Sequence, residues 1–223
     1  MDAGNDVLDE MFEVMPPRPP WPEGWHEAKP QPMAGGRPVK RGAWLAIHGD
    51  GMIYATKGNK TYEFYQYFPM EDSWTRRADM PLGEKYPDKG SKGISDGERY
   101  IYMTQGNNSL GFWRYDILMD SWMILPDVPL GPSRKKVKGG TDMVYIPGTG
   151  ADFVYLLKGY RSEFFRFDVG LETWEQLDDA PTGIRAKWDK GSWLVFDDSD
   201  RLYAHKAKYH ELWTYALDDS GWS

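Results

Sequence analysis

The chain has 223 residues, enough to bury a sizeable hydrophobic core, and its 27 basic and 34 acidic side chains give a net charge of −7. Because the negative charge is spread along the chain, composition gives no indication of binding to nucleic acid or to a membrane surface. The absence of cysteine excludes disulfides, thiolate metal sites and a cysteine nucleophile.

Residues 1–22 are acidic and then proline-rich, ending in PPRPPWP. This composition predicts an irregular or extended arm. The segment lacks the basic and apolar regions of a signal peptide, and no apolar run in the chain is long enough to cross a membrane. Neither observation fixes the compartment, which stays open.

Tryptophans recur at a nearly constant interval after the arm. Trp25, Trp74, Trp122, Trp174 and Trp222 are separated by 49, 48, 52 and 48 residues. A fixed period of this size indicates a repeat architecture.

Other marks keep the same phase. Each of the last four tryptophans follows two aromatic residues spaced two apart, which are Tyr65 and Tyr67, Trp113 and Tyr115, Phe165 and Phe167, and Trp213 and Tyr215. The spacing of two puts both rings on one face of a strand. Phe64, Phe112, Phe164 and Leu212 point to the other face, so the predicted sheets are apolar on both faces and must be covered on both.

Each repeat therefore reads as four short antiparallel strands. The first begins at a basic residue followed by glycine, and turn-forming Gly, Asp and Ser residues separate it from the second. The last strand begins at the tryptophan and ends near a proline, which cannot extend a central ladder. Sheets of this kind stack as blades around an axis.

Four-stranded units of about 50 residues with a glycine after the second strand, an aromatic pair and a late tryptophan resemble Kelch repeats. The resemblance covers Trp25 to Trp222 and implies a β-propeller. The usual double glycine of Kelch units is here a Lys-Gly or Gln-Gly pair, and the fourth unit has Ala207. Kelch-like propellers include protein-binding scaffolds, sugar-processing enzymes and a copper oxidase whose Tyr-Cys crosslink this chain cannot form.

The predicted fold is thus all-β, a propeller of four blades over residues 23–223. The repeats span about residues 33–81, 82–129, 130–181 and 182–223, and residues 23–32 are expected to complete the last blade as its fourth strand. Closure of this kind leaves no free sheet edge. The alternative is part of a larger propeller, such as half of a ring completed by a second chain.

The strand order predicts two rings of polar side chains at one end of the axis. The first comprises the residues at the start of each first strand: Arg41, Lys89, Lys138 and Lys190. The second comprises the residues at the end of each second strand: Lys57, Gln105, Lys158 and Lys206. Acidic turns gather at the opposite end. The cations either bind an anion or donate to backbone carbonyls between blades.

The primary hypothesis is a non-enzymatic propeller that binds a protein partner, an anionic small molecule or a carbohydrate at the basic end. The alternatives are an enzyme acting on an acidic sugar at the same end and a self-assembly module. No cofactor is predicted, and the four histidines lack zinc-ligand spacing. The sequons at Asn59 and Asn107 occupy the same loop of two repeats, so turn chemistry explains them better than glycosylation.

Overall fold

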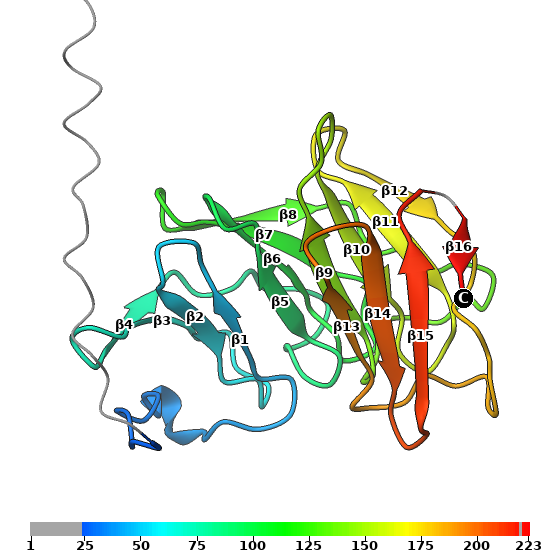
Figure 1. The fold of residues 1–223 in the computed structure, drawn as a ribbon. Coiled ribbons are helices and arrows are strands. Elements are labelled where there is room, and N and C mark those ends of the chain that lie inside the picture. Colours follow the sequence, from blue (N-terminus) through cyan, green and yellow to red (C-terminus); the bar gives the residue numbers. More distant parts are fainter. Residues whose placement is uncertain (1–23, 219) are drawn as a thin grey trace, which may run out of the picture.

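Four antiparallel sheets of four strands each make up the fold of a computed structural model that describes residues 24–218 and 220–223. The arm predicted over residues 1–22 lies outside the described residues. In each sheet the strands follow one another in sequence order, as Figure 1 shows. The all-β, four-bladed fold predicted from the sequence is therefore confirmed, and each sheet is called a blade below.

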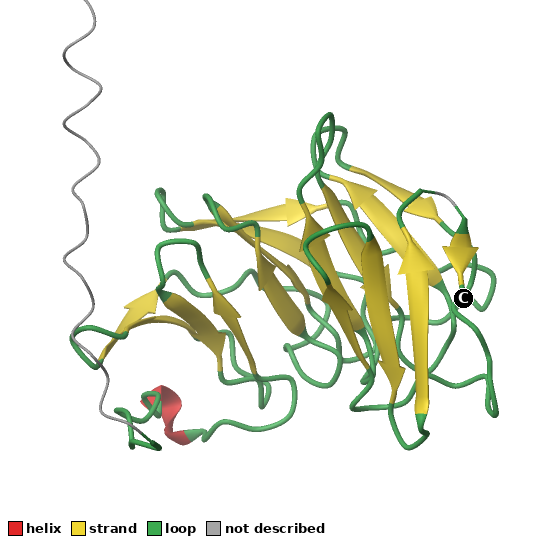
Figure 2. Cartoon of the chain, viewed as in Figure 1, coloured by secondary structure: helices red, strands yellow, loops and turns green. Residues whose placement is uncertain are grey.

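Blade 1 contains β1 (Trp44–Ile47), β2 (Ile53–Thr56), β3 (Phe64–Phe68) and β4 (Ser73–Arg77). Blade 2 contains β5 (Lys92–Ser95), β6 (Tyr100–Thr104), β7 (Phe112–Asp116) and β8 (Ser121–Leu125). Blade 3 contains β9 (Asp142–Ile146), β10 (Phe153–Leu157), β11 (Phe164–Asp168) and β12 (Thr173–Gln176). Blade 4 contains β13 (Trp193–Phe196), β14 (Arg201–Lys206), β15 (Glu211–Ala216) and β16 (Gly221–Trp222). A single turn of 3-10 helix, η2 (Ala34–Gly36), precedes blade 1 (Figure 2).

Side-chain carboxylates set the turns between the first two strands of three blades. Asp50 Oδ1 accepts the backbone N–H of Met52 at 2.8 Å, and Asp96 Oδ1 accepts that of Glu98 at 2.8 Å. Asp197 Oδ1 accepts the N–H of Ser199 at 2.9 Å in the same way. These short local bonds are the turn chemistry expected of aspartate, so the acidic turns need no partner to explain them.

The blades pack through both of their faces. The inner strands lie side by side in the order β1, β5, β9, β13, and three hydrophobic clusters fill the spaces between successive blades. In the cluster between blades 1 and 2, Trp44, Tyr54 and Phe64 meet Trp113 and Tyr115. Each blade is covered on both faces only if it has a neighbour on both sides, as blades 2 and 3 do.

The predicted closure of the ring by the Trp25 segment is wrong. Blade 4 takes its fourth strand from β16, and no strand forms in the described residues before β1. Trp25 is fully exposed. Blades 1 and 4 end an open row rather than packing on each other (Figure 1).

The Trp25 segment instead packs on blade 1. Trp74 Nε1 donates to the carbonyl of Lys29 at 2.8 Å, and Asp72 accepts the N–H of Lys29 at 2.7 Å. In the later blades the corresponding tryptophans donate to the residue four positions after the preceding tryptophan, namely Ala78, Pro126 and Asp178. Lys29 stands four positions after Trp25. The sequence equivalence was therefore correct, but it describes the segment that follows a fourth strand, not the strand itself.

Candidate functional site

The second predicted ring lies inside the blades. Lys57, Lys158 and Lys206 have fully buried side chains, and Gln105 is buried as well. Each side chain donates to backbone carbonyls of the loop that leads into its own blade. Lys57 Nζ lies 2.7 Å from the carbonyl oxygen of Ala34, for example.

Lys158 and Lys206 bind two such carbonyls each. Lys158 Nζ donates to Pro129 O at 2.9 Å and to Leu130 O at 2.7 Å. Lys206 Nζ donates to the carbonyls of Thr182 and Arg185. The four side chains therefore hold the loops that lead into the blades, which is the carbonyl-binding role that the sequence left open beside ligand binding.

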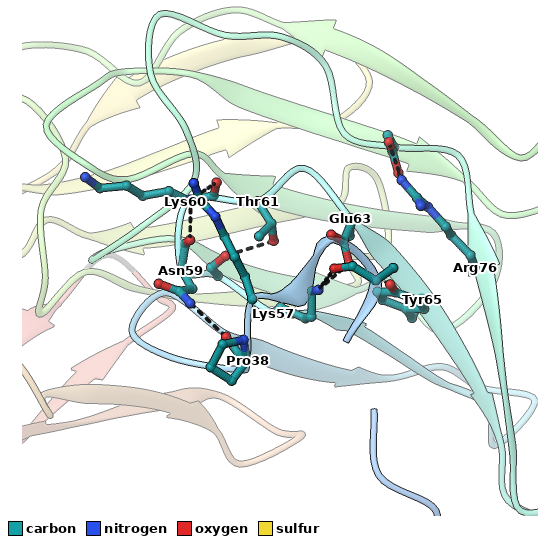
Figure 3. Close-up of polar contacts among 12 residues, drawn as sticks. Pro38, Lys57, Asn59, Lys60, Thr61, Glu63, Tyr65 and Arg76 are labelled. Atoms are coloured by element: carbon teal, nitrogen blue, oxygen red, sulfur yellow. Dashed lines mark hydrogen bonds and ion pairs between the residues drawn. The ribbon is translucent and has the colours of Figure 1, made fainter. Parts of the chain in front are cut away.

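A glutamate balances each buried lysine. Lys57 pairs with Glu63, Lys158 with Glu163 at 3.0 Å, and Lys206 with Glu211 at 3.5 Å. Figure 3 shows Lys57 and Glu63 pointing toward one another, with Tyr65 beside the carboxylate. Burial lowers the pKa of Lys158, and the carboxylate of Glu163 opposes that shift.

Blade 2 has neither charge. Gln105 replaces the lysine and donates to the carbonyl of Lys85, and Gly111 stands where the other blades have the glutamate. A Cβ atom on Gly111 would lie 2.8 Å from Gln105 Oε1, so a larger side chain there would require the amide to move. The cation and its carboxylate are thus lost together, as expected when a lone buried charge is costly.

Three members of the first predicted ring lie together. Arg41, Lys89 and Lys190 line one cavity of about 260 Å³ at the starts of the inner strands. The rest of the lining comes from all four blades and is rich in glycine: Gly42, Ala43, Gly90, Ser91, Lys92, Gly139, Gly140, Thr141, Gly191 and Ser192. The strand starts of four blades therefore converge on one hollow, as predicted.

Lys138 does not occupy the predicted ring position. Gly42, Gly90, Gly140 and Gly191 are the equivalent glycines, because all four have φ between 81° and 95° and each precedes the first strand by two residues. The third repeat has two glycines in succession, Gly139 and Gly140. Aligning the repeats on their basic-glycine pairs took Gly139 as the equivalent glycine, which was wrong. The ring residue of blade 3 is Gly139, and the stem of Lys190 lies against it, since a Cβ there would be 2.8 Å from Lys190 Cγ.

Lys138 lines a second cavity, of about 300 Å³, with Asn107, Asn108 and Tyr160. Lys89, Gly139 and Lys190 border both cavities, so the two hollows adjoin. The adjoining cavities are called the axial basic site below. No Asp or Glu lines either cavity in the described part of the chain.

Carboxylates just outside the axial basic site neutralise part of its charge. Asp88 accepts two bonds from Arg41, the shorter from Nε at 2.8 Å, and Asp142 lies 2.9 Å from Lys92 Nζ. Lys208 and Lys187 contact Asp189, whose buried position alone would raise its pKa but whose contact with Lys208 helps to hold that pKa at about 2. In residues 24–218 and 220–223, no ion pair joins Lys89, Lys138 or Lys190 to a carboxylate.

Sequence reasoning missed Asp88 and Asp189, which immediately precede ring cations. Each is buried and accepts the backbone N–H of the following lysine, at 2.9 and 2.8 Å. The triplet Asp-Lys-Gly occurs at both places, and this repetition is the signal that could have identified them.

The loops that carry the two sequons are tight turns. Asn59 and Asn107 have φ of 49° and 52°, and their side-chain amides donate to Pro38 O and Tyr86 O, both at 2.9 Å. The hydroxyls of Thr61 and Ser109 donate to the glycine carbonyls that begin each turn. The Asn59, Thr61, Asn107 and Ser109 side chains thus have a structural role in the turns, and Figure 3 shows the first sequon.

In the part of the chain that the structure describes, no group of three His, Asp or Glu side chains is arranged to hold a metal ion. None of the helical structure in that part is long and apolar enough to span a membrane.

No protein-family model matches the chain, and no curated protein is similar to it in sequence. We therefore infer function from the site itself.

Proposed function

We propose that the protein is a non-enzymatic, Kelch-like propeller module that binds an anionic ligand in the axial basic site. The observation that carries the proposal is the convergence of Lys89, Lys138 and Lys190 on two adjoining cavities without a carboxylate in the lining. All three residues are exposed, so their ammonium groups reach water and a diffusing ligand.

Like charges a few ångströms apart in water cost on the order of 1 kcal/mol for each pair, and a bound anion removes that cost. The mixed lining of ammonium groups, Asn side chains and Tyr160 suits an oxyanion with further hydroxyl groups, such as a phosphate ester or an acidic sugar. An acidic side chain of a partner protein has the same chemistry.

The lining also favours binding over acid–base catalysis. An enzyme acting on an acidic sugar needs a carboxylate or another proton-transferring group next to the substrate. The described lining offers basic, hydroxyl and amide side chains and one tyrosine. The enzymatic hypothesis remains the second candidate, with Tyr160 or one of the lysines as the group it would use.

Titration calorimetry with inorganic phosphate, sulfate, citrate and glucuronate tests the proposal at low and high salt. Removing one charge-assisted contact, as in Lys89→Ala or Lys190→Ala, should weaken binding about tenfold or more, since such a bond is worth about 1.5–3 kcal/mol. The matched control is Lys135→Ala, which removes an equal charge from an exposed residue outside both cavities. Equal loss in the control and the site variants, or no salt-sensitive binding to any probe, would contradict the proposal.

A further inference from the structure

Each blade has two apolar faces with different partners. The leading face packs on the next blade and the trailing face packs on the preceding one. In blade 1 the leading face includes Trp44 and Ala46, which alternate along β1 with Leu45 and Ile47 on the trailing face. The same alternation builds all three interfaces between successive blades.

The terminal blades leave one face of each kind without a partner. On the trailing face of blade 1, Leu45 and Ile47 are 65% and 71% exposed. On the leading face of blade 4, Trp193, Val195 and Leu212 are 41%, 47% and 57% exposed. Contiguous exposed apolar side chains on a sheet face mark an interaction surface rather than ordinary surface variation.

An aromatic cluster recurs at every internal interface. A phenylalanine on the leading face packs edge-on against an aromatic residue and a tryptophan of the next blade, in the sets Phe64–Tyr115–Trp122, Phe112–Phe167–Trp174 and Phe164–Tyr215–Trp222. Blade 1 carries the receiving half, Tyr67 and Trp74, with ring centroids 4.8 Å apart. Leu212 of blade 4 stands at the position of the phenylalanine, because it pairs with His205 as Phe64 pairs with Thr56.

Contacts between successive inner strands also show which residues of blades 4 and 1 would meet. The first residue of an inner strand contacts the second residue of the next inner strand. Trp44 lies over Gly93, where a Cβ would be 2.4 Å from the ring, and Asp142 accepts the N–H of Leu194 at 3.0 Å. By the same rule, Trp193 would face Leu45, and Val195 would face Ile47. Both pairs are apolar.

One part of the missing neighbour is already present. At internal interfaces, the segment after the preceding blade's tryptophan covers the outer part of the trailing face, and residues 29–34 do this for blade 1 through the contacts of Lys29 and Ala34. What blade 1 lacks is the set of strands that would precede this segment. Blade 4 carries a leading face of the matching register but does not pack on blade 1 of its own chain.

We propose that a second copy of this chain covers these faces, with blade 4 of each copy packed on blade 1 of the other. Such a head-to-tail contact closes after two copies into a ring of eight sheets with two identical interfaces. Propellers of four to eight blades are within the known range. This inference does not depend on the axial basic site.

Light scattering coupled to gel filtration over a range of concentrations gives the first test. Wild type should have twice the chain mass of 25.7 kDa. Ile47→Glu and Val195→Glu should each give monomers, because each places a charge in both interfaces. Leu171→Glu, at a 74% exposed turn residue outside both faces, is the control and should stay dimeric. A mixture of Ile47→Glu and Val195→Glu should recover part of the dimer, since one interface of the mixed pair is then free of substitutions.

Cysteine crosslinking gives a second test that does not depend on the charged variants folding. The chain has no cysteine, so Leu45→Cys and Trp193→Cys each introduce a single thiol. On oxidation, a mixture of the two should give a covalent dimer. A wild-type monomer at all concentrations, an assembly larger than a dimer, or a disulfide within one chain of the Leu45→Cys/Trp193→Cys double variant would overturn the proposal. Phosphate binding in the same samples is a separate readout.

Discussion

Replacing Lys158 by glutamine should destabilise the fold strongly although the residue lines neither cavity of the axial basic site. Lys158 Nζ contacts two backbone carbonyls, at 2.7 and 2.9 Å, and Glu163 Oε2 at 3.0 Å, with the two side chains 0% and 3% exposed. Lys158→Gln leaves the carboxylate of Glu163 buried with only the N–H and hydroxyl of Ser133 as donors.

The expected loss follows from the burial of the pair. Breaking a buried ion pair from one side costs about 3–5 kcal/mol, since the remaining charge is left uncompensated. In a chain of this size, 1 kcal/mol lowers the melting temperature by roughly 2–4 °C, so the expected drop is about 6–20 °C. Urea unfolding followed by tryptophan fluorescence and circular dichroism gives the free energy of unfolding directly.

A double variant separates the charge effect from the loss of contacts. Lys158→Gln/Glu163→Gln removes both charges while keeping an amide donor and an acceptor, which resembles the neutral arrangement around Gln105 in blade 2. We expect it to recover about 1–3 kcal/mol relative to the sum of the single variants. Lys136→Gln is the control, since it breaks an exposed pair with Glu84 at 2.7 Å and should cost at most about 1 kcal/mol. A Lys158→Gln variant as stable as the control, or strictly additive single variants, would refute the reasoning.

The remaining predictions concern tyrosine titration and the inner turns. Burial raises the pKa of Tyr54 and Tyr67 from 10.0 to about 12, so the stability they contribute is complete below pH 10 and lost toward pH 12. Unfolding free energies measured over that range should fall, and less steeply in Tyr54→Phe; an unchanged slope contradicts the assignment. Gly90→Ala should be at least about 2 kcal/mol more destabilising than Gly97→Ala. Both glycines have positive φ, but a Cβ on Gly90 would lie 2.1 Å from Lys138 O, whereas nothing lies within 4 Å of one on Gly97. Equal urea midpoints for the two variants would show that the close contact with Lys138 O does not affect stability.

The fold could be predicted because the repeats encode packing. Tyr65, Trp113 and Phe165 are each at most 2% exposed. The last four of the periodic tryptophans occupy the predicted fourth strands, namely Trp74, Trp122, Trp174 and Trp222. Apolar side chains recur every second residue within a strand, and the whole pattern recurs about every 50 residues from one blade to the next. Both periods follow from sheets that stack through both faces. Sequence alone could not show whether the Trp25 segment pairs as a strand. The residues that follow a fourth strand match the repeat pattern whether or not that strand is part of a sheet.

The site was only partly predictable. Lys138 was misplaced by one residue because Gly139 is the glycine that follows a basic residue, whereas the backbone dihedral shows that Gly140 is the equivalent glycine. Lys57, Lys158 and Lys206 were expected in an axial ring because each lies at the end of a second strand, and the sequence did not show that they are buried. The partners were in the sequence, since a glutamate follows these lysines by six, five and five residues, but the spacing has a meaning only once β2 and β3, β10 and β11, and β14 and β15 are paired.

The lysines at this end of the molecule fall into two classes, one buried and paired with a carboxylate and the other exposed and unpaired in the described residues. Lys57, Lys158 and Lys206 are buried and each has a glutamate, and where the lysine becomes Gln105 the glutamate becomes Gly111. Lys89, Lys138 and Lys190 are exposed and have no such partner in the described residues. At the first ring Arg41 is matched by Asp88 and blade 3 has Gly139, so Lys89 and Lys190 are the ring cations without a carboxylate in the described residues. Together with Lys138 they surround two adjoining cavities, which is the reason to look there for an anion. The buried lysines show what a matched cation in this fold looks like.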